Sequence, residues 1–578
     1  MMTQFLRTTS KDFVRHRYFY LILCLLLLAM SLTLHPGTQG ADARRYLRWT
    51  HSFVFDQDLH LLNNFEATGG SYRLTPTGYV FELANVGTPL LWTPFYSAAA
   101  LFLPDSAGSE SYPADATIQL LWLNFSSWLY TILAGILTFA ALRQLFTAGV
   151  VVAAITAILL GTPVLFYMVT FSLSVHPSII FLSALLLYLW QRDRSGPSIF
   201  YYLVIGLVIG WLMLIATYNI VFFLLPGLDL LKEWARQKNW RQFLKHSLAL
   251  GLGGLLGFLP QMIVWWFLFG SPFYSPYAGQ LLWTEPYIGA TLFSTFHGLF
   301  FFAPVLLLVL PGLWRLRRTD GWAALSLGLV WLALTYIVSI NVAWWAGSSF
   351  GNRYFLTLSP FFVWGLAAFI RQNTRWSVPL ILLCVLWTLG LYLQFLNGIR
   401  LTSDSVIYPA ADIARGQIAA LANIWGILPR LWANLPWLSV SIFALPFFFL
   451  ILGGLSRVVY GWTMNRPNSP SKRQSHLKFD TVGESPRSEH PPMRTALLRP
   501  ASASRDASLL SKNEFAISIK FVLVAVSGAI ILFIALAGWR GEQTRAVLAS
   551  QGFYKQPHEV LLREVKEVAG KSGLVTRA

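Results

Sequence analysis

The sequence predicts an all-α protein that crosses a membrane many times. Of its 578 residues, 55% are hydrophobic and only 12% are charged, and the mean hydropathy is +0.55. Both values lie far from those of an average soluble domain. Several apolar runs approach or exceed the roughly 17 to 25 residues that a transmembrane helix needs. They include Tyr18–Leu34, Ile118–Leu142, Val150–Val169, Leu248–Phe269 and Phe521–Ala537. Because a helix satisfies its own backbone hydrogen bonds in lipid, we expect a helical bundle.

Lys and Arg set the expected orientation, because cytoplasmic loops carry an excess of them. The N-terminal segment is basic and is predicted to be cytoplasmic, as are further basic turns. If all of these turns lie on one side, the chain makes about thirteen spans. This count requires Phe200–Leu231 to cross twice, with a turn near Thr217–Asn219. The loops predicted on the outer face are Pro36 to about Ala116, Gly270–Gly289, Asn341–Arg353 and Asn397–Pro436.

Composition divides the chain into four parts. Residues 1–456 form the predicted transmembrane domain, with the first outer loop at 35–116. Residues 457–519 are basic and rich in Ser and Pro, which is typical of a disordered cytoplasmic linker. Residues 520–538 form a last span, and residues 539–578 an outer tail with amphipathic character.

Several other classes of function find little support. The net charge of +18 lies largely in loops that orientation already explains, so we do not expect nucleic-acid binding. Cys24 and Cys384 lie in apolar spans, which argues against a disulfide framework. No nucleotide-binding phosphate loop occurs in the sequence. The small residues around Asp42 resemble a signal-peptide cleavage site, but the preceding apolar run is long for such a peptide.

The first outer loop gathers carboxylates in a chain that is otherwise poor in them. On a helix, Asp42, Arg45, Tyr46, Trp49 and Phe53 would lie on neighbouring positions, which predicts an amphipathic helix at the membrane interface. Asp42 would then be a general base at the mouth of a membrane cavity. The alternative is that Asp42 caps this helix.

Several segments resemble bacterial GT-C-fold glycosyltransferases related to the dolichyl-phosphate-mannose protein mannosyltransferases. They are DARRYLRWTHSFVFDQDLHLLNNF, NVGTPLLWTPFY, GTPVLFYMVTFSLSVHPS, FLPQMIVWWFLFGSPF, LFSTFHGLFFFAPVLLLVLPGL and WWAGSSFGNRYFLTLSP, between about residues 15 and 400. The resemblance implies a GT-C-type bundle that transfers a sugar from a polyprenyl-phosphate donor, usually with inversion. It also implies that Asp42 is the catalytic base. Many relatives have Asp-Glu where this chain has Asp42-Ala43, and many have an Arg where it has Thr217-Tyr218.

An anionic lipid phosphate leaves in such a reaction, so the site needs fixed cations and one carboxylate. Arg353 is the main phosphate candidate, because its guanidinium can bind phosphate through two hydrogen bonds; the alternative is an Arg whose charged end reaches the interface from a helix end. Arg45 and His176 are further phosphate candidates. Candidates for sugar or acceptor contacts are Tyr46, Asn85, His297 and Trp345. Trp283 and Trp344 are aromatic candidates, although Trp is enriched at membrane interfaces in general.

Asp56-Gln57-Asp58 forms a short acidic pattern that can hold a divalent cation such as Mg²⁺ or Mn²⁺. The alternatives for Asp56, Asp58 and Glu66 are a second acid of the site or a role in structuring the loop, and no cofactor is firmly predicted. The sequence therefore predicts a multi-pass plasma-membrane glycosyltransferase. Its partners would be a polyprenyl-phosphate-sugar and a lipid, glycan or protein acceptor on the outer face. The rival classes are a lipid or sugar transporter, or flippase, and a catalytically silent scaffold. A transporter usually carries ionisable groups near the bilayer midplane, where this chain has few.

Overall fold

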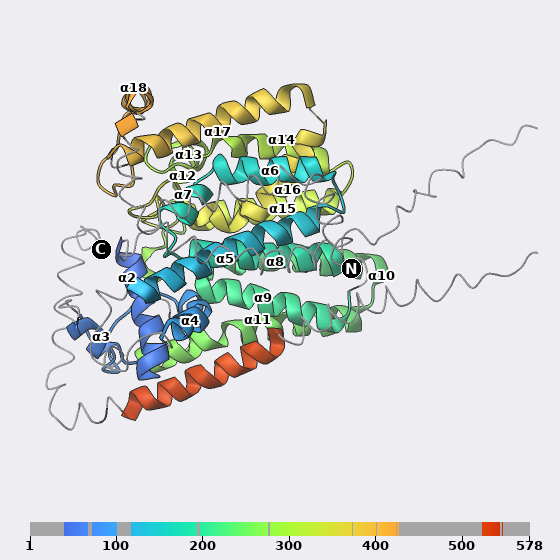
Figure 1. The fold of residues 1–578 in the computed structure, drawn as a ribbon. Helices are drawn as coiled ribbons and strands as arrows, with labels where there is room; N and C mark the ends of the chain where they lie inside the picture. Colours follow the sequence, from blue (N-terminus) through green and yellow to red (C-terminus); the bar gives the residue numbers. More distant parts are fainter. Residues whose placement is uncertain are drawn as a thin grey trace, which may run out of the picture.

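A computed structural model shows an all-helical protein whose long helices run side by side (Figure 1). The structure describes residues 40–67, 72–100, 117–193, 197–274, 278–372, 374–399, 401–423, 425–426, 523–543 and 546. Within these residues the β-structure consists of two isolated bridges, Leu74 with Val80 and Leu281 with Asn341. The predicted all-α class is thus confirmed for this part of the chain. The predicted first span and the linker at 457–519 lie outside it.

The α-helices range in length from the four residues of α13 to the thirty of α11. In chain order they are α2 (Gly40–His51), π-helix η1 (Ser52–Asp56), α3 (Leu62–Ala67), α4 (Gly87–Ala100), α5 (Thr117–Leu142), α6 (Ala148–Leu160), α7 (Val164–Val169), α8 (His176–Asp193), α9 (Ile199–Ile215), η3 (Thr217–Phe223), α10 (Leu224–Gln237), α11 (Trp240–Phe269), η4 (Ala278–Gln280), α12 (Ile288–Phe293), α13 (Leu299–Phe302), η5 (Pro304–Leu308), α14 (Val309–Leu316), α15 (Gly321–Ser339), η6 (Arg353–Leu358), α16 (Ser359–Gln372), α17 (Thr374–Leu396) and α18 (Ala410–Ala422). A last helix covers Leu523–Gln543.

Six of the described helical segments are long and apolar enough to cross a membrane. They are Trp122–Leu142, Trp240–Phe269, Gly321–Ser339, Arg353–Arg371, Arg375–Leu396 and Leu523–Gln543. The count of about thirteen spans stays a prediction, since further spans were expected outside the described residues. The chain is a helical protein with several candidate membrane spans.

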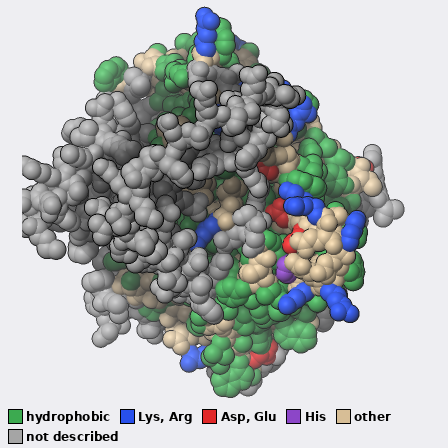
Figure 2. Space-filling view, turned by 90° about the vertical axis from the view of Figure 1, so that its right-hand side faces the viewer, with side chains coloured by type: hydrophobic (Ala, Val, Ile, Leu, Met, Phe, Trp, Pro, Cys, Tyr) green, Lys and Arg blue, Asp and Glu red, His purple; other side chains and the backbone are tan. Residues whose placement is uncertain are grey.

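Basic side chains are present at the end of the bundle where α10 lies. Helices α2, α3, α7, α12 and α18 lie toward one end, and α10 lies toward the other (Figure 1). Figure 2 faces the end of α10 and shows Lys and Arg side chains around the part that is not grey. Basic residues of α10 and the start of α11, such as Lys232, Lys238 and Lys245, belong to this region. This distribution of Lys and Arg agrees with the positive-inside rule if this end of the bundle is cytoplasmic.

The predicted turn within Phe200–Leu231 is present. Helix α9 ends at Ala216, whose backbone is extended (φ −153°, ψ 120°), and Thr217 begins the 3₁₀-helix that leads into α10. The Asn219 side chain donates to the carbonyl of Leu212 at 2.9 Å, which also accepts from the backbone amide of Ala216, and so ties the turn to the end of α9. Two short helical segments thus take the place of a single long helix.

Glycine allows α9 and α11 to pack unusually closely. A Cβ on Gly206 would lie 2.1 Å from the Leu250 carbonyl oxygen, and one on Gly253 would lie 2.0 Å from the Leu203 carbonyl oxygen. Such backbone contact between helices is typical of small residues in membrane bundles. The pair anchors the part of the bundle that the first outer loop covers.

We expect Gly253→Val to destabilise the protein by about 1–3 kcal/mol or more, because the added atoms must push two backbones apart. The matched control is Gly251→Val in the same helix, since a Cβ on Gly251 meets no atom within 4 Å. Thermal unfolding in detergent, followed by size-exclusion fluorescence, would measure both variants. Equal melting temperatures for the two would contradict the close packing.

The first outer loop folds back onto the bundle. The amide of Val86 donates to Gln261 Oε1 at 3.0 Å, and Thr77 Oγ1 donates to the carbonyl of Phe267 at 2.8 Å, so the loop is attached to α11. Trp49 and Tyr79 of this loop are fully buried. The loop is therefore a packed part of the protein and can hold side chains in fixed positions.

Candidate active site

The central feature of the site is an ion pair between the two most prominent sequence candidates. Asp42 lies in the first turn of α2, and Arg353 is the first residue of η6. Arg353 Nη1 donates to Asp42 Oδ2 at 2.7 Å across 311 residues of sequence. The two side chains are 23% and 38% exposed, so the pair is partly screened from solvent. Asp42 lies inside the first turn rather than before it, and its carboxylate faces Arg353, which leaves no support for the capping alternative.

A second carboxylate, which sequence reasoning missed, lies beside this pair. Arg45 Nη1 lies 3.7 Å from Asp42 Oδ1, and its Nε lies 3.5 Å from Glu82 Oε1. Arg48 Nη1 lies 3.7 Å from Glu82 Oε2. Arg45, predicted to bind phosphate, thus lies between two carboxylates. The sequence offered one signal for Glu82, which is that it is a single acidic residue in an apolar stretch of the first outer loop.

The Glu82 carboxyl is buried. Burial raises its pKa, and the guanidinium groups of Arg45 and Arg48 oppose this shift, as do the amides of Leu83 and Ala84. The Leu83 amide donates to Glu82 Oε1 at 2.8 Å. Glu82 is therefore a group that takes up a proton more readily than an exposed glutamate, close to Asp42.

We expect Glu82→Gln to change the pH dependence of stability. A raised pKa in the folded state means that the protonated carboxyl stabilises the fold below the unfolded pKa of about 4.3. This contribution is lost as the pH rises through the folded value. The neutral amide has no such loss, so the melting temperature of the variant minus that of the wild type should increase with pH. Melting curves between about pH 4 and pH 7 would measure it. A difference that decreases with pH would show that the pairing with Arg45 and Arg48 outweighs burial.

The loop between α15 and η6 curves over the guanidinium of Arg353. Ala346 and Gly347 both have positive φ, 68° and 65°, and a Cβ on Gly347 would lie 3.9 Å from Arg353 Nη2. The side-chain Nδ2 of Asn352 donates to the Trp344 carbonyl at 2.9 Å and closes the loop. Trp345 Nε1 and Asn352 Oδ1 are buried and have no hydrogen-bond partner among the described residues. A ligand at Arg353 could satisfy such groups.

His176 is buried against the same cluster. It is the first residue of α8 and 3% exposed, and its ring packs on Tyr167 with centroids 4.3 Å apart. Neither ring nitrogen has a hydrogen-bond partner within the described part of the chain, and the same holds for the hydroxyls of Ser174 and Ser178. Buried polar groups are nearly always paired, so these groups mark a place where a polar ligand fits. The structure thus brings the candidates Asp42, Arg353, Arg45 and His176 together.

The acidic pattern in the first loop structures that loop. Asp58 Oδ1 accepts from the amide of His60 at 2.9 Å and from Ser52 Oγ at 3.2 Å. Asp56 Oδ2 instead accepts from the Asn64 side chain at 3.1 Å. The two carboxylates thus have different partners, and in the described residues no group of three or more His, Cys, Asp or Glu could hold a metal ion. Glu66 belongs to α3, but its side chain lies outside the described residues.

The sugar-contact candidates have separate surroundings. His297 has both ring nitrogens near backbone carbonyls, Nδ1 3.0 Å from Trp345 O and Nε2 3.1 Å from Leu401 O, so it ties two loops together. Asn85 donates to the Met213 carbonyl at 3.5 Å. Tyr46 packs edge-on against Trp92. Only Trp345 among these candidates keeps a buried donor without a partner in the described residues.

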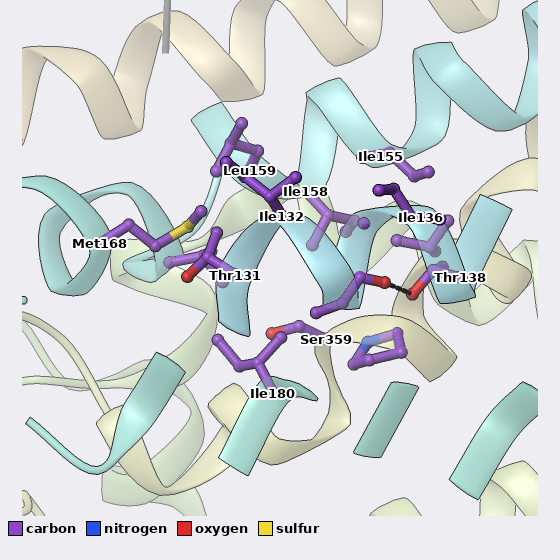
Figure 3. A pocket seen from close by; sticks show the side chains of 15 residues that line it. Thr131, Ile132, Ile136, Thr138, Ile155, Ile158, Leu159, Met168, Ile180 and Ser359 are labelled. Carbon is purple, nitrogen blue, oxygen red and sulfur yellow. Dashed lines mark hydrogen bonds between the residues drawn. The ribbon is translucent and has the colours of Figure 1, made fainter. Parts of the chain in front are cut away.

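An apolar cavity of about 120 Å³ lies between α5, α6, α7, α8 and α16. Figure 3 shows Thr131, Ile180, Met168 and Ser359 among its lining side chains. Ile180 follows His176 by one helical turn on α8, Met168 follows Tyr167, and Ser359 directly follows η6. The cavity therefore shares α7 and α8 with Tyr167 and His176, and Ser359 of its lining directly follows η6, which begins with Arg353.

Comparison with known proteins gives a likeness in structure alone. No family model matches the chain, and no curated protein matches it. The structure is similar to the crystal structure of ArnT from Cupriavidus metallidurans bound to undecaprenyl phosphate, with 16% identity, a TM-score of 0.42 and 74% of each chain covered. For the same protein in the apo state the identity is 17% and the TM-score 0.43, with 75% of this chain and 74% of that chain covered.

Proposed function

We propose that the protein is a GT-C-type membrane glycosyltransferase that moves a sugar from a polyprenyl-phosphate donor to an acceptor on the outer face of the plasma membrane. The observation that supports this most is the ion pair of Asp42 and Arg353 beside buried polar groups at the start of α8 that have no hydrogen-bond partner among the described residues. A base, a fixed cation and vacant donors are the three parts that such a reaction needs.

In the proposed reaction Asp42 is the base and polyprenyl phosphate is the leaving group. An acceptor hydroxyl oxygen attacks the anomeric carbon of the sugar, and the bond from that carbon to the phosphate oxygen breaks. The electron pair leaves with the polyprenyl phosphate, and Asp42 takes the hydroxyl proton. Attack opposite to the leaving phosphate gives inversion. The acceptor is a hydroxyl of a lipid, a glycan or a protein.

Phosphate recognition rests on Arg353, His176 and the start of α8. The guanidinium offers two parallel donors to phosphate oxygens. His176 contributes a donor from either ring nitrogen, depending on its tautomer. The first amides of an α-helix and its dipole favour an anion at that end. Binding of the donor would exchange Asp42 for phosphate at part of the guanidinium and release the carboxylate for proton transfer.

The apolar cavity suits a stretch of the polyprenyl chain. Its lining is almost entirely hydrocarbon, with Ile132, Ile158 and Leu159 on α5 and α6. A dry apolar cavity of comparable size binds a small hydrocarbon in other proteins. A lipid whose phosphate lies at Arg353 would have its first isoprene units close to this cavity.

Sugar transfer by the purified protein in lipid tests the proposal. A panel of radiolabelled polyprenyl-phosphate sugars is offered together with membrane acceptors from the host, and the product is identified by its label. Transfer from one donor would establish the class and name the sugar. If no donor reacts while the protein moves labelled lipid between leaflets, the transporter or flippase alternative replaces the enzyme.

A further inference from the structure

The last described helix, Leu523–Gln543, packs against helices that are far from it in sequence. Figure 1 draws it in red beside α11, and its outer end reaches the region of the first outer loop. Trp211 Nε1 of α9 donates to Ser527 Oγ at 2.9 Å, and both residues are buried. Ile534 and Ala537 are also fully buried. The helix is therefore docked in a defined register on the bundle.

A close approach to α11 fixes this register. The backbone at Gly538 lies against the Phe267 ring, so that a Cβ added to Gly538 would come within 2.0 Å of a ring carbon. Any larger residue at position 538 must displace the ring or lift the helix. Gly528 in the same helix meets no atom within 4 Å of its added Cβ. One face of the helix is thus sensitive to size and the other is not.

On both sides of Gly538 the helix also contacts the first outer loop. Phe533 packs edge-on against Phe53 of η1, with ring centroids 5.8 Å apart. Arg540 Nη1 donates to Gln57 Oε1. A Cβ on Gly541 would lie 3.1 Å from the Tyr79 hydroxyl. The last helix therefore contacts two parts of the loop. One is η1 with the following Gln57, which continues α2, and the other is the turn at Tyr79, shortly before Glu82.

We propose that the last helix is a positioning element for the site, an inference that rests on the proposed function. Phe53 follows Asp42 by eleven residues along α2 and η1, a lever of about 16 Å at 1.5 Å per residue. A small tilt at the Phe53 end therefore moves the Asp42 carboxylate relative to Arg353. Misplacement of a reacting group by about 1 Å can lower a rate by about 100-fold. The helix holds α2 at the angle at which Asp42 meets Arg353.

Gly538→Leu in the full chain tests this proposal. The expected result is a kcat for sugar transfer that is lower by about 10- to 100-fold, with a donor KM within about threefold of wild type, because the phosphate-binding groups are untouched. Gly528→Leu is the matched control and should keep the kcat of the wild type. The double variant Gly538→Leu with Phe267→Ala restores room for the added side chain and should recover most of the lost kcat.

Cross-linking measures docking without any activity. In a chain with Cys24→Ser and Cys384→Ser, the changes Gln57→Cys and Arg540→Cys place two thiols at the outer contact. A short bifunctional thiol reagent should cross-link the two thiols. The yield of cross-link should fall when Gly538→Leu is added and return to its original level when Phe267→Ala is added as well.

Two results would overturn the proposal. One is a wild-type kcat for Gly538→Leu, together with a reduced cross-link. The other is a lost kcat with an unchanged cross-link. If the cross-link yields follow the expected pattern but neither wild type nor any variant transfers sugar, the packing of the last helix is supported. The proposed function then fails, and with it the positioning role of the helix.

Discussion

Asp42→Asn is expected to lower kcat for sugar transfer by about 10²- to 10⁴-fold, the contribution that a positioned general base usually makes. The amide keeps the shape of the side chain and can still accept from Arg353, so the loop should stay in place. What is lost is the group that takes the acceptor proton. Because Asp42 and the donor phosphate compete for the same guanidinium, the donor KM should stay equal or fall.

The matched control for this change is Asp412→Asn. Asp412 also pairs with an arginine, Arg415, at 2.6 Å, but on the exposed surface of α18. This control should keep full activity, since an exposed pair contributes little. Initial rates at saturating donor, with size-exclusion profiles of each variant, would separate loss of chemistry from loss of folding. Equal rates for wild type and Asp42→Asn would remove Asp42 from the role of base.

The sequence was most informative where a pattern is local. The spacing of Asp42, Arg45 and Trp49 predicts an amphipathic helix, and α2 covers these residues. Its buried residues are Ala43, Leu47, Trp49, Thr50 and His51. The turn near Thr217 was predicted as well, because the count of about thirteen spans requires Phe200–Leu231 to cross twice, although each half is short for a span. In both cases the information lies within a few turns of helix.

Features that depend on distant partners were missed. Glu82 reads as an isolated acid, since its partners Arg45 and Arg48 lie in another part of the loop and only the fold joins them. His297 was predicted as a sugar or acceptor contact. Both of its ring nitrogens lie near backbone carbonyls, which every residue has and no sequence pattern marks. The apolar cavity depends on how α5, α6, α7, α8 and α16 fill space between them, which residue type alone does not determine.

Arg353→Gln is expected to lower kcat/KM by about 10²- to 10³-fold, equal to about 3–4 kcal/mol, the usual cost of removing one charge-stabilising donor. The change removes the cation that faces the leaving phosphate and also the partner of Asp42. Arg353→Lys keeps the charge but loses the planar pair of donors, so about a tenfold loss is expected. Arg415→Gln, the other member of the exposed pair, should change nothing measurable.

A binding measurement distinguishes phosphate recognition from positioning of Asp42. Polyprenyl phosphate without a sugar carries the group that Arg353 is proposed to bind but has no bond to break. Its affinity should fall strongly with Arg353→Gln and stay the same or rise with Asp42→Asn. The double variant, Asp42→Asn with Arg353→Gln, should transfer sugar at a rate close to that of the slower single variant. The effects of two residues that act as one unit are not additive. Unchanged lipid affinity in Arg353→Gln would leave Arg353 only the task of holding Asp42, and phosphate binding would then pass to His176 and the start of α8.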